Sequence, residues 1–252
     1  MNHLLSICLL FLTGLFAGFV DSIAGGGGLI TVPVLLSLGV NAQQALGTNK
    51  IQSTCGSGSA AWHYARAGAV PLRDCGRAFV FSLIGAALGT IVVLRVDPSF
   101  LRRAIPILLI AVALYVLLRP QLGAQDIHPR MGRRSFDVIF GLGIGFYDGF
   151  FGPGTGTFWT MAYMLCLGFN LARATGYAKV VNFASNAGSL VFFLWRGKFV
   201  LEYGLVMGVG QLLGARIGAG MVVARGTKFV RPVFLTAVFA LAIKLLYDAY
   251  FR

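Results

Sequence analysis

The sequence predicts an all-α polytopic membrane protein made of two inverted repeats, and three observations support this fold class. The first is composition: 57% of the 252 residues are hydrophobic and only 12% are charged, whereas soluble domains are usually about a quarter charged. The second is a series of apolar segments separated by short polar stretches. The third is that the second half of the chain repeats the residue pattern of the first. The 34 glycines agree with this class, because glycine is more frequent in membrane helices than in soluble ones.

Each half contains about five apolar segments. In the first half they lie at roughly 4–20, 28–38, 51–65, 77–94 and 104–118. In the second half they lie at roughly 136–151, 156–168, 180–195, 203–222 and 232–247. The second segment of each half is short for a span, because a hydrocarbon core of about 30 Å needs about 20 helical residues, and the sequence leaves open whether it spans or re-enters. We therefore expect a short broken or re-entrant helix in each half.

The two halves keep a nearly constant register. Asp21 and Asp148 are 127 residues apart, and a two-residue insertion then changes the offset to 129, so that Lys50 matches Lys179. Such self-similarity indicates an internal duplication. It divides the chain into a first membrane repeat, a basic linker and a second membrane repeat, at 1–118, 119–135 and 136–252.

An odd number of segments per half would give the two repeats opposite orientations, as in many secondary transporters. Lysine and arginine are then more numerous on the side of the linker. The positive-inside rule therefore predicts that the linker is cytoplasmic and that both termini lie on the outer side of the membrane, which is the periplasm in a bacterial inner membrane. A re-entrant pair in place of the first two segments would preserve this parity, whereas a single broken helix would reverse it.

Glycine clusters and a carboxylate interrupt an apolar segment in each half. "GFVDSIAGGGG" holds Asp21 and "GFYDGFFGPGTG" holds Asp148. Non-helical backbone at membrane depth is tolerated where it is buried in protein or lines a watery cavity. Helices that restart after the glycines would present free N–H groups and a partial positive charge to an anion. The candidate anion-binding glycines are Gly25, Gly26, Gly27, Gly28, Gly152, Gly154 and Gly156.

Polar side chains follow each glycine cluster. The candidate donors to an anion are Asn49, Lys50, Lys179, Asn182 and Asn186. Lysine supplies a point charge and asparagine supplies amide donors, which together suit an oxyanion. The two aspartates would repel an anion, so we expect them to pair with the lysines or to carry a coupling proton. A purely structural alternative stays open, in which glycines serve helix packing, aspartates cap the short helices and lysines reach the headgroups.

Other functional classes find little support in the sequence. The four cysteines and three histidines lack metal-ligand spacing, so no metal site and no cofactor are expected. No Walker-type P-loop, nucleophile elbow or zinc-protease motif occurs, which argues against an enzyme. The basic residues form no aromatic-interleaved patch, so nucleic acid is not an expected partner despite a net charge of +13. The expected partners are the lipid bilayer, a small anionic substrate and a coupling proton or cation.

The motifs "AGGGGLITVPVLLSLGV", "ALGTNKIQST" and "GFYDGFFGPGTGTFW" closely resemble the TauE/SafE family of sulfite exporter-like permeases, and "GQLLGARIG" resembles its YfcA-type branch. The resemblance covers nearly the whole chain. It implies a bacterial inner-membrane secondary transporter of a small anion, such as a sulfur-containing oxoanion, an organosulfonate or an organic acid. Pro153 stands where the first half has Gly26, and Ala178 where it has Asn49, so the two half-sites are unequal.

We therefore expect the anion to bind near the membrane midplane between the two repeats. Two alternatives remain at this point: an anion channel, and a membrane assembly or interaction factor without a transported substrate. Accumulation against a gradient would separate a transporter from a channel. An assembly factor would have no need of lysines and asparagines at midplane depth.

Overall fold

The computed structural model describes residues 3–97, 99–101, 107, 126 and 128–225, and every regular element in these ranges is helical. The elements are α1 (His3–Ala24), α2 (Gly27–Ser37), α3 (Ala42–Arg66), the 3-10 turn η1 (Leu72–Cys75), α4 (Gly76–Val93), α6 (Arg133–Phe150), α7 (Thr155–Leu167), α8 (Leu171–Trp195) and α9 (Leu201–Arg225). The predicted all-α class is confirmed. The predicted segments at 104–118 and 232–247 lie almost entirely outside the described residues.

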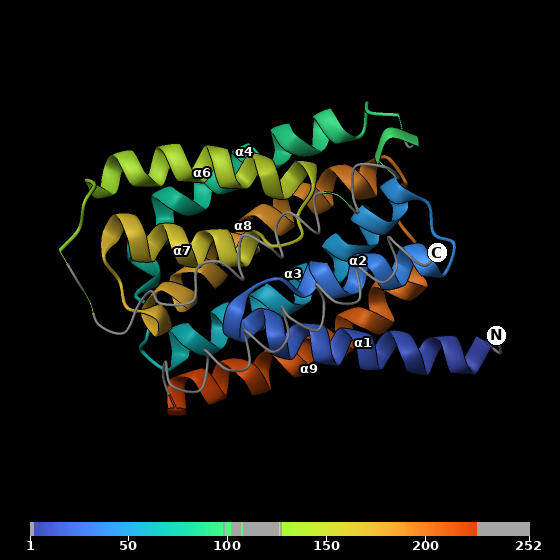
Figure 1. The fold of residues 1–252 in the computed structure, drawn as a ribbon, viewed down its shortest axis with the longest axis horizontal. Helices are drawn as coiled ribbons and strands as arrows, with labels where there is room; N and C mark the ends of the chain where they lie inside the picture. The colour runs from blue at the N-terminus through green and yellow to red at the C-terminus, as the bar shows by residue number, and fades with distance from the viewer. Residues whose placement is uncertain (1–2, 98, 102–106, 108–125, 127, 226–252) are drawn as a thin grey trace.

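The two halves run in opposite directions. In Figure 1, α1 runs leftward from the N-terminus, whereas α6 starts at the left end and runs rightward. Each of these helices stops at a glycine break, and the following short helix turns back toward the end from which the first entered. At the left end, the amides of Arg130 and Met131 both donate to the carbonyl of Cys166, which places the start of α6 beside the end of α7. The helices α1 and α2 therefore form one hairpin and α6 and α7 form another, and the two hairpins enter the molecule from opposite ends.

Three helical stretches of the described chain are long and apolar enough to cross a membrane: Leu5–Ala24, Leu72–Val93 and Leu201–Arg225. The helices α3, α6 and α8 are missing from this set although they are of similar length. All three carry buried charged side chains, namely Lys50, Asp148 and Lys179. These three helices supply three of the buried charged side chains, and the fourth, Asp21, lies on the strongly apolar helix α1.

Two helix boundaries were predicted too late. The apolar segments were expected to begin near 51 and 180, but α3 begins at Ala42 and α8 at Leu171. Both helices start in the same way, with an asparagine side chain that accepts a hydrogen bond from the amide three residues on: Asn41 from Gln44 and Asn170 from Arg173. Such caps satisfy an otherwise unpaired helix amide. The caps show that these first turns, which carry Gln43, Gln44 and Arg173, belong to the helices.

Glycines line two equivalent helix crossings between the halves. On α1 and α9 they are Gly14, Gly18, Gly210, Gly214 and Gly218, and on α4 and α6 they are Gly85, Gly89, Gly141, Gly145 and Gly149. At each crossing the backbones touch, so that a Cβ added to almost any of these glycines would overlap the facing chain. Small residues at four-residue spacing allow this close approach in membrane helices. The glycines in "SLIGAALG" and "QLLGARIG" are packing residues, and we call the two crossings the glycine seams.

Replacing Gly145 with alanine tests the seam between α4 and α6. The added Cβ would lie 2.5 Å from the carbonyl oxygen of Ser82, and overpacking of this kind costs about 1–3 kcal/mol of stability. Gly143 on the same helix has nothing within 4 Å of an added Cβ, so alanine there should be neutral or stabilising. Thermal unfolding in detergent measures both. Equal melting temperatures for the two variants would show that the seam does not need glycine.

Candidate functional site

The two glycine breaks touch each other in the interior of the molecule. Gly25 and Gly26 precede α2 with φ of 81° and 90°, and Gly152 and Gly154 precede α7 with φ of 93° and 87°. Residues other than glycine rarely adopt such angles. A Cβ on Gly25 would overlap the amide of Thr157, so that the end of α1 lies directly against the start of α7. The breaks predicted from sequence are present, and they meet.

Two buried ion pairs cross between the halves at this point. Lys50 Nζ lies 2.7 Å from Asp148 Oδ1, and Lys179 Nζ lies 2.9 Å from Asp21 Oδ2. The lysine of each half therefore pairs with the aspartate of the other. The exposed fractions of the two lysine side chains are 1% and 0%. Removing charges from water is costly unless they are paired, so the pairing explains how four ionisable groups remain buried here.

The aspartates also hold the breaks in shape. Asp21 Oδ1 accepts a hydrogen bond of 3.0 Å from the amide of Gly27, the first residue of α2. Asp148 Oδ1 accepts one of 3.0 Å from the hydroxyl of Thr155, the first residue of α7. The aspartates thus pair with lysines, as expected, and also cap or brace the short helices, as the structural alternative proposed. Asp21 precedes the first residue of α2 by six positions, and Asp148 precedes the first residue of α7 by seven.

The asparagines form a hydrogen-bonded rim around the ion pairs. Asn49 Oδ1 accepts from Thr31 Oγ1 at 2.8 Å and from Gln52 Nε2 at 3.0 Å. Asn186 Oδ1 accepts from Lys50 Nζ at 3.2 Å, and its Nδ2 donates to the carbonyl of Asn182 at 2.9 Å. All of these side chains are buried. The side-chain oxygens of Asn49 and Asn186 are therefore both held by neighbouring donors.

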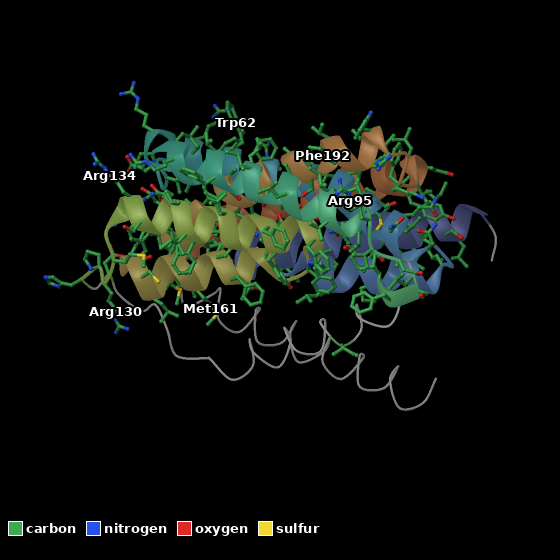
Figure 2. The ribbon with its side chains drawn as sticks, turned by 90° about the horizontal axis from the view of Figure 1, so that it is seen from above. Trp62, Arg95, Arg130, Arg134, Met161 and Phe192 are labelled. Carbon is green, nitrogen blue, oxygen red and sulfur yellow. The ribbon has the colours of Figure 1, made fainter. Side chains whose placement is uncertain are left out.

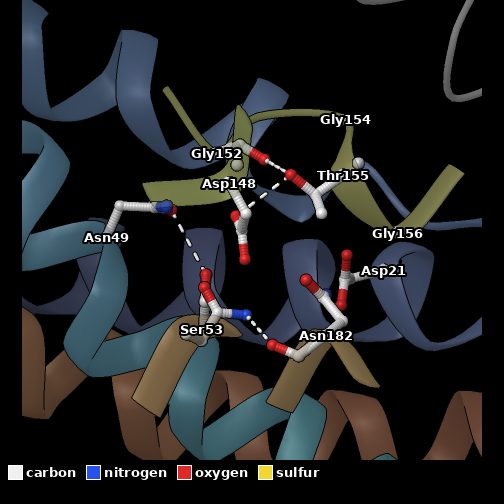
Figure 3. A pocket seen from close by; sticks show the side chains of 12 residues that line it. Asp21, Asn49, Ser53, Asp148, Gly152, Gly154, Thr155, Gly156 and Asn182 are labelled. Carbon is white, nitrogen blue, oxygen red and sulfur yellow. Dashed lines mark hydrogen bonds between the residues drawn. The ribbon is translucent and has the colours of Figure 1, made fainter. Parts of the chain in front are cut away.

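A small cavity of about 10 Å³ lies at the centre of this arrangement. It is lined by Asp21, Gly26, Gly28, Asn49, Ser53, Asp148, Gly152, Gly154, Thr155, Gly156, Asn182 and Asn186, and Figure 3 shows how these residues surround it. A cavity of roughly this size holds about one water molecule. Within the described chain, Asp148 Oδ2 and Asn182 Oδ1 are buried without a hydrogen-bond partner. The cavity therefore has acceptor oxygens available for a proton or for a donor.

The structure brings most of the predicted site residues to this cavity. Gly25 and Gly27 lie just behind its wall, the first against Thr157 and the second against Asp21. The lysine side chains lie directly against the glycines of the second break and the start of α7. A Cβ added to Gly152 would be 3.0 Å from Lys50 Nζ, and one added to Gly156 would be 3.0 Å from Lys179 Nζ.

Two lining residues, Ser53 and Thr155, were not predicted as site residues. Ser53 lies one helical turn after Asn49, and Thr155 lies inside the "GPGTG" motif, so their positions alone could have suggested them. In the described part of the chain, no group of three His, Cys, Asp or Glu side chains could hold a metal ion.

Comparison with known proteins identifies the family. The family model described as sulfite exporter TauE/SafE matches residues 10–245. The chain belongs to the TauE/SafE family. It is 44% identical to "Probable membrane transporter protein YfcA" of Escherichia coli K12, over 96% of this chain and 90% of the relative. It is 42% identical to a "Probable membrane transporter protein" of Haemophilus influenzae, over 96% and 95%. No solved structure matches.

More distant TauE/SafE relatives share the same general description. The chain is 24% identical to "Probable membrane transporter protein YdhB" of Bacillus subtilis, over 86% of this chain and 89% of the relative. These names describe membrane transporters and not enzymes. The resemblance noted in the sequence, including that to YfcA, is therefore confirmed, and the site between the glycine breaks lies well inside the region that the TauE/SafE model matches.

Proposed function

We propose that this protein is a secondary transporter that carries a small anion through the site between the two glycine breaks. The observation that carries the proposal is the exchange of partners between halves: each lysine is held by the aspartate of the opposite repeat, at the start of a broken helix. Broken helices at a repeat interface are the usual substrate sites of transporters with inverted repeats. The substrate class is a sulfur-containing oxoanion, an organosulfonate or an organic acid.

The charges at the site determine how an anion can bind. Two ammonium groups and two carboxylates cancel, so an anion must compete with Asp21 or Asp148 for a lysine. Asp148 Oδ2, which has no hydrogen-bond partner in the described chain, is the atom that we propose for the coupling proton. The lysine would then bind the anion while the protonated aspartate carries the coupling proton, so the two would move together.

The size of the cavity requires a change of conformation. Space for about one water molecule cannot hold an oxoanion with three or four heavy atoms. One hairpin must move away from the other before substrate can reach Lys50 or Lys179. Because the hairpins α1–α2 and α6–α7 come from opposite ends, movement of one opens the site to one side of the membrane. Movement of the other opens it to the other side, which is alternating access.

The distribution of arginine supports an orientation in the inner membrane with the linker in the cytoplasm. At the end of the molecule where α6 begins, α3 and α9 end and α8 begins (Figure 1). The described arginines at or next to these helix ends are Arg66, Arg73, Arg77, Arg130, Arg133, Arg134, Arg173 and Arg225, whereas Arg95 and Arg196 follow α4 and α8 at the opposite end. By the positive-inside rule the first end faces the cytoplasm, which places the start of α1 in the periplasm. Lys50 and Lys179 do not belong in this comparison, although the sequence allowed them as loop charges, because both are buried.

Cysteine labelling checks this orientation. In a variant without native cysteines, Lys198→Cys should react with a membrane-impermeant maleimide in intact spheroplasts, and Arg134→Cys should react only after the membrane is permeabilised. Both side chains are exposed. The reverse pattern would mean that the linker is periplasmic.

Transport in proteoliposomes tests the proposed function. With sulfite, thiosulfate, a sulfonate or a carboxylate on both sides, an imposed pH difference should drive accumulation of the true substrate above its external concentration. A channel would only equalise the two concentrations. If no member of the panel moves or raises the melting temperature of the protein, the case for a factor without a transported substrate becomes the stronger one, because a ligand bound only by the folded form stabilises it.

A further inference from the structure

A second cavity lies on the outer surface, away from the ion pairs. It has a volume of about 370 Å³ and is lined by Ser59, Trp62, His63, Arg66, Ala67 and Arg216. All but Arg216 come from the end of α3, and Arg216 comes from the facing side of α9. The hydroxyl of Ser59 donates to the carbonyl of Leu212 at 3.0 Å and ties the two helices together at its inner edge. We call this cavity the α3–α9 groove.

The groove concentrates positive charge without a protein counter-charge. Arg66 and Arg216 are exposed, and no carboxylate of the described chain lies within 4.0 Å of either guanidinium. Arginine presents a planar fork of donors that matches phosphate oxygens. The groove is therefore suited to an anionic group that comes from outside the protein.

The depth of Arg216 limits what that anion can be. Arg216 lies nine residues before the end of α9 at Arg225, which is roughly 14 Å along the helix axis at 1.5 Å per residue. Its neighbours Leu213 and Ile217 are exposed apolar side chains with exposed fractions of 43% and 55%. A charge on such a lipid-facing surface is costly unless it finds a partner. Because a long arginine side chain can extend toward the headgroups, the phosphate of a lipid can serve as that partner.

Trp62 strengthens this assignment. Its exposed fraction is 64%, and it projects from the surface of the molecule in Figure 2. Tryptophan favours the headgroup level of a bilayer, where its ring can contact both acyl chains and polar groups. It lies one helical turn before Arg66, so an aromatic ring and a guanidinium flank the same groove. The apolar neighbours suit acyl chains, which a soluble anion does not have.

We propose that the α3–α9 groove binds the phosphate headgroup of an anionic phospholipid, with Arg66 and Arg216 as the phosphate ligands and Trp62 against the glycerol and the upper acyl chains. The site is separate from the ion pairs and does not depend on which anion is transported. It assigns a role to Arg216, which has no matching arginine in the first repeat.

Native mass spectrometry and thermal unfolding of the full chain in neutral detergent test the proposal. Phosphatidylglycerol added to the wild type should remain bound and raise the melting temperature, whereas phosphatidylcholine should do so much less. The variant Arg66→Gln/Arg216→Gln should bind phosphatidylglycerol roughly 30-fold more weakly, from about 1 kcal/mol per arginine near a membrane surface. The matched control is Arg134→Gln, which removes an exposed arginine at the same end of the molecule and should bind like the wild type.

Three outcomes would overturn the assignment. Equal binding of phosphatidylglycerol by the double variant and the wild type would place the lipid elsewhere. Equal stabilisation by inorganic phosphate or glycerol phosphate would make the groove a site for soluble anions. An equal loss of phosphatidylglycerol binding in Arg134→Gln would show that binding depends on overall surface charge and not on the groove. Size-exclusion profiles and helical content, unchanged between variants, ensure that lost binding reflects the groove and not unfolding.

Discussion

Replacing Lys50 with alanine should lower the free energy of unfolding by about 3–5 kcal/mol, because removing one member of a buried pair leaves the other charge uncompensated. The charge left behind is the carboxylate of Asp148, whose side chain is only 2% exposed. The same change should abolish substrate accumulation in proteoliposomes. Lys179→Ala should behave alike through its partner Asp21. Thermal unfolding measures the first effect and flux measures the second.

A double variant separates the two effects. Lys50→Ala/Asp148→Ala leaves no buried charge at that position, so most of the lost stability should return. Flux should stay absent, since the ammonium that would bind the anion is missing. Lys198→Ala provides the matched control, because Lys198 is an exposed lysine that does not line the cavity. If Lys50→Ala and Lys179→Ala both transport at the wild-type rate, the lysines have no part in the mechanism.

Replacing Gly25 with alanine should have the second large effect, on stability and on transport together. Gly25 has φ of 81°, which is strained for any residue with a Cβ, and its Cβ would overlap the amide of Thr157. Holding a non-glycine residue at positive φ costs of order 1–3 kcal/mol, and the overlap adds to this. The two breaks would have to separate, which would disturb the wall of the cavity.

Gly39 offers an unusually clean comparison for this variant. It has the same φ of 81°, yet an added Cβ would meet nothing within 4 Å. Gly39→Ala therefore measures the conformational cost alone, and the difference between the two variants measures the contact between the breaks. We expect near-normal flux for Gly39→Ala and little or none for Gly25→Ala. Indistinguishable flux in the two variants would be incompatible with a site that depends on close contact between the breaks.

The fold class and the breaks could be predicted because they depend on local chemistry. Glycine after an apolar run marks a backbone that leaves the helix, and the repeated pattern gives the same result twice. The starts of α3 and α8 were missed for an equally local reason: their first turns are polar, and hydropathy alone assigns such residues to loops. Their asparagine caps, Asn41 and Asn170, are the signals that could have corrected this.

The geometry of the candidate site could be predicted only in part. Sequence spacing put a lysine and an aspartate in each half but could not show that each lysine pairs with the aspartate of the other half. Such pairing depends on how two hairpins meet in space. For the same reason the cavity was expected to be a wet pocket shared by the halves, whereas its volume is close to that of a single water. Thr155 and Ser53 enter the lining through this close approach.

The glycine seams have a mechanical consequence. Helices that interlock through large side chains must unpack those side chains before they can move, which makes their contacts stiff and bistable. At the seams the helix backbones are in direct contact, so α1 can slide along α9, and α6 along α4, without first unpacking large side chains. Each hairpin can therefore move as a rigid body along the seam. A low barrier to such shear would let the protein change quickly between its two faces.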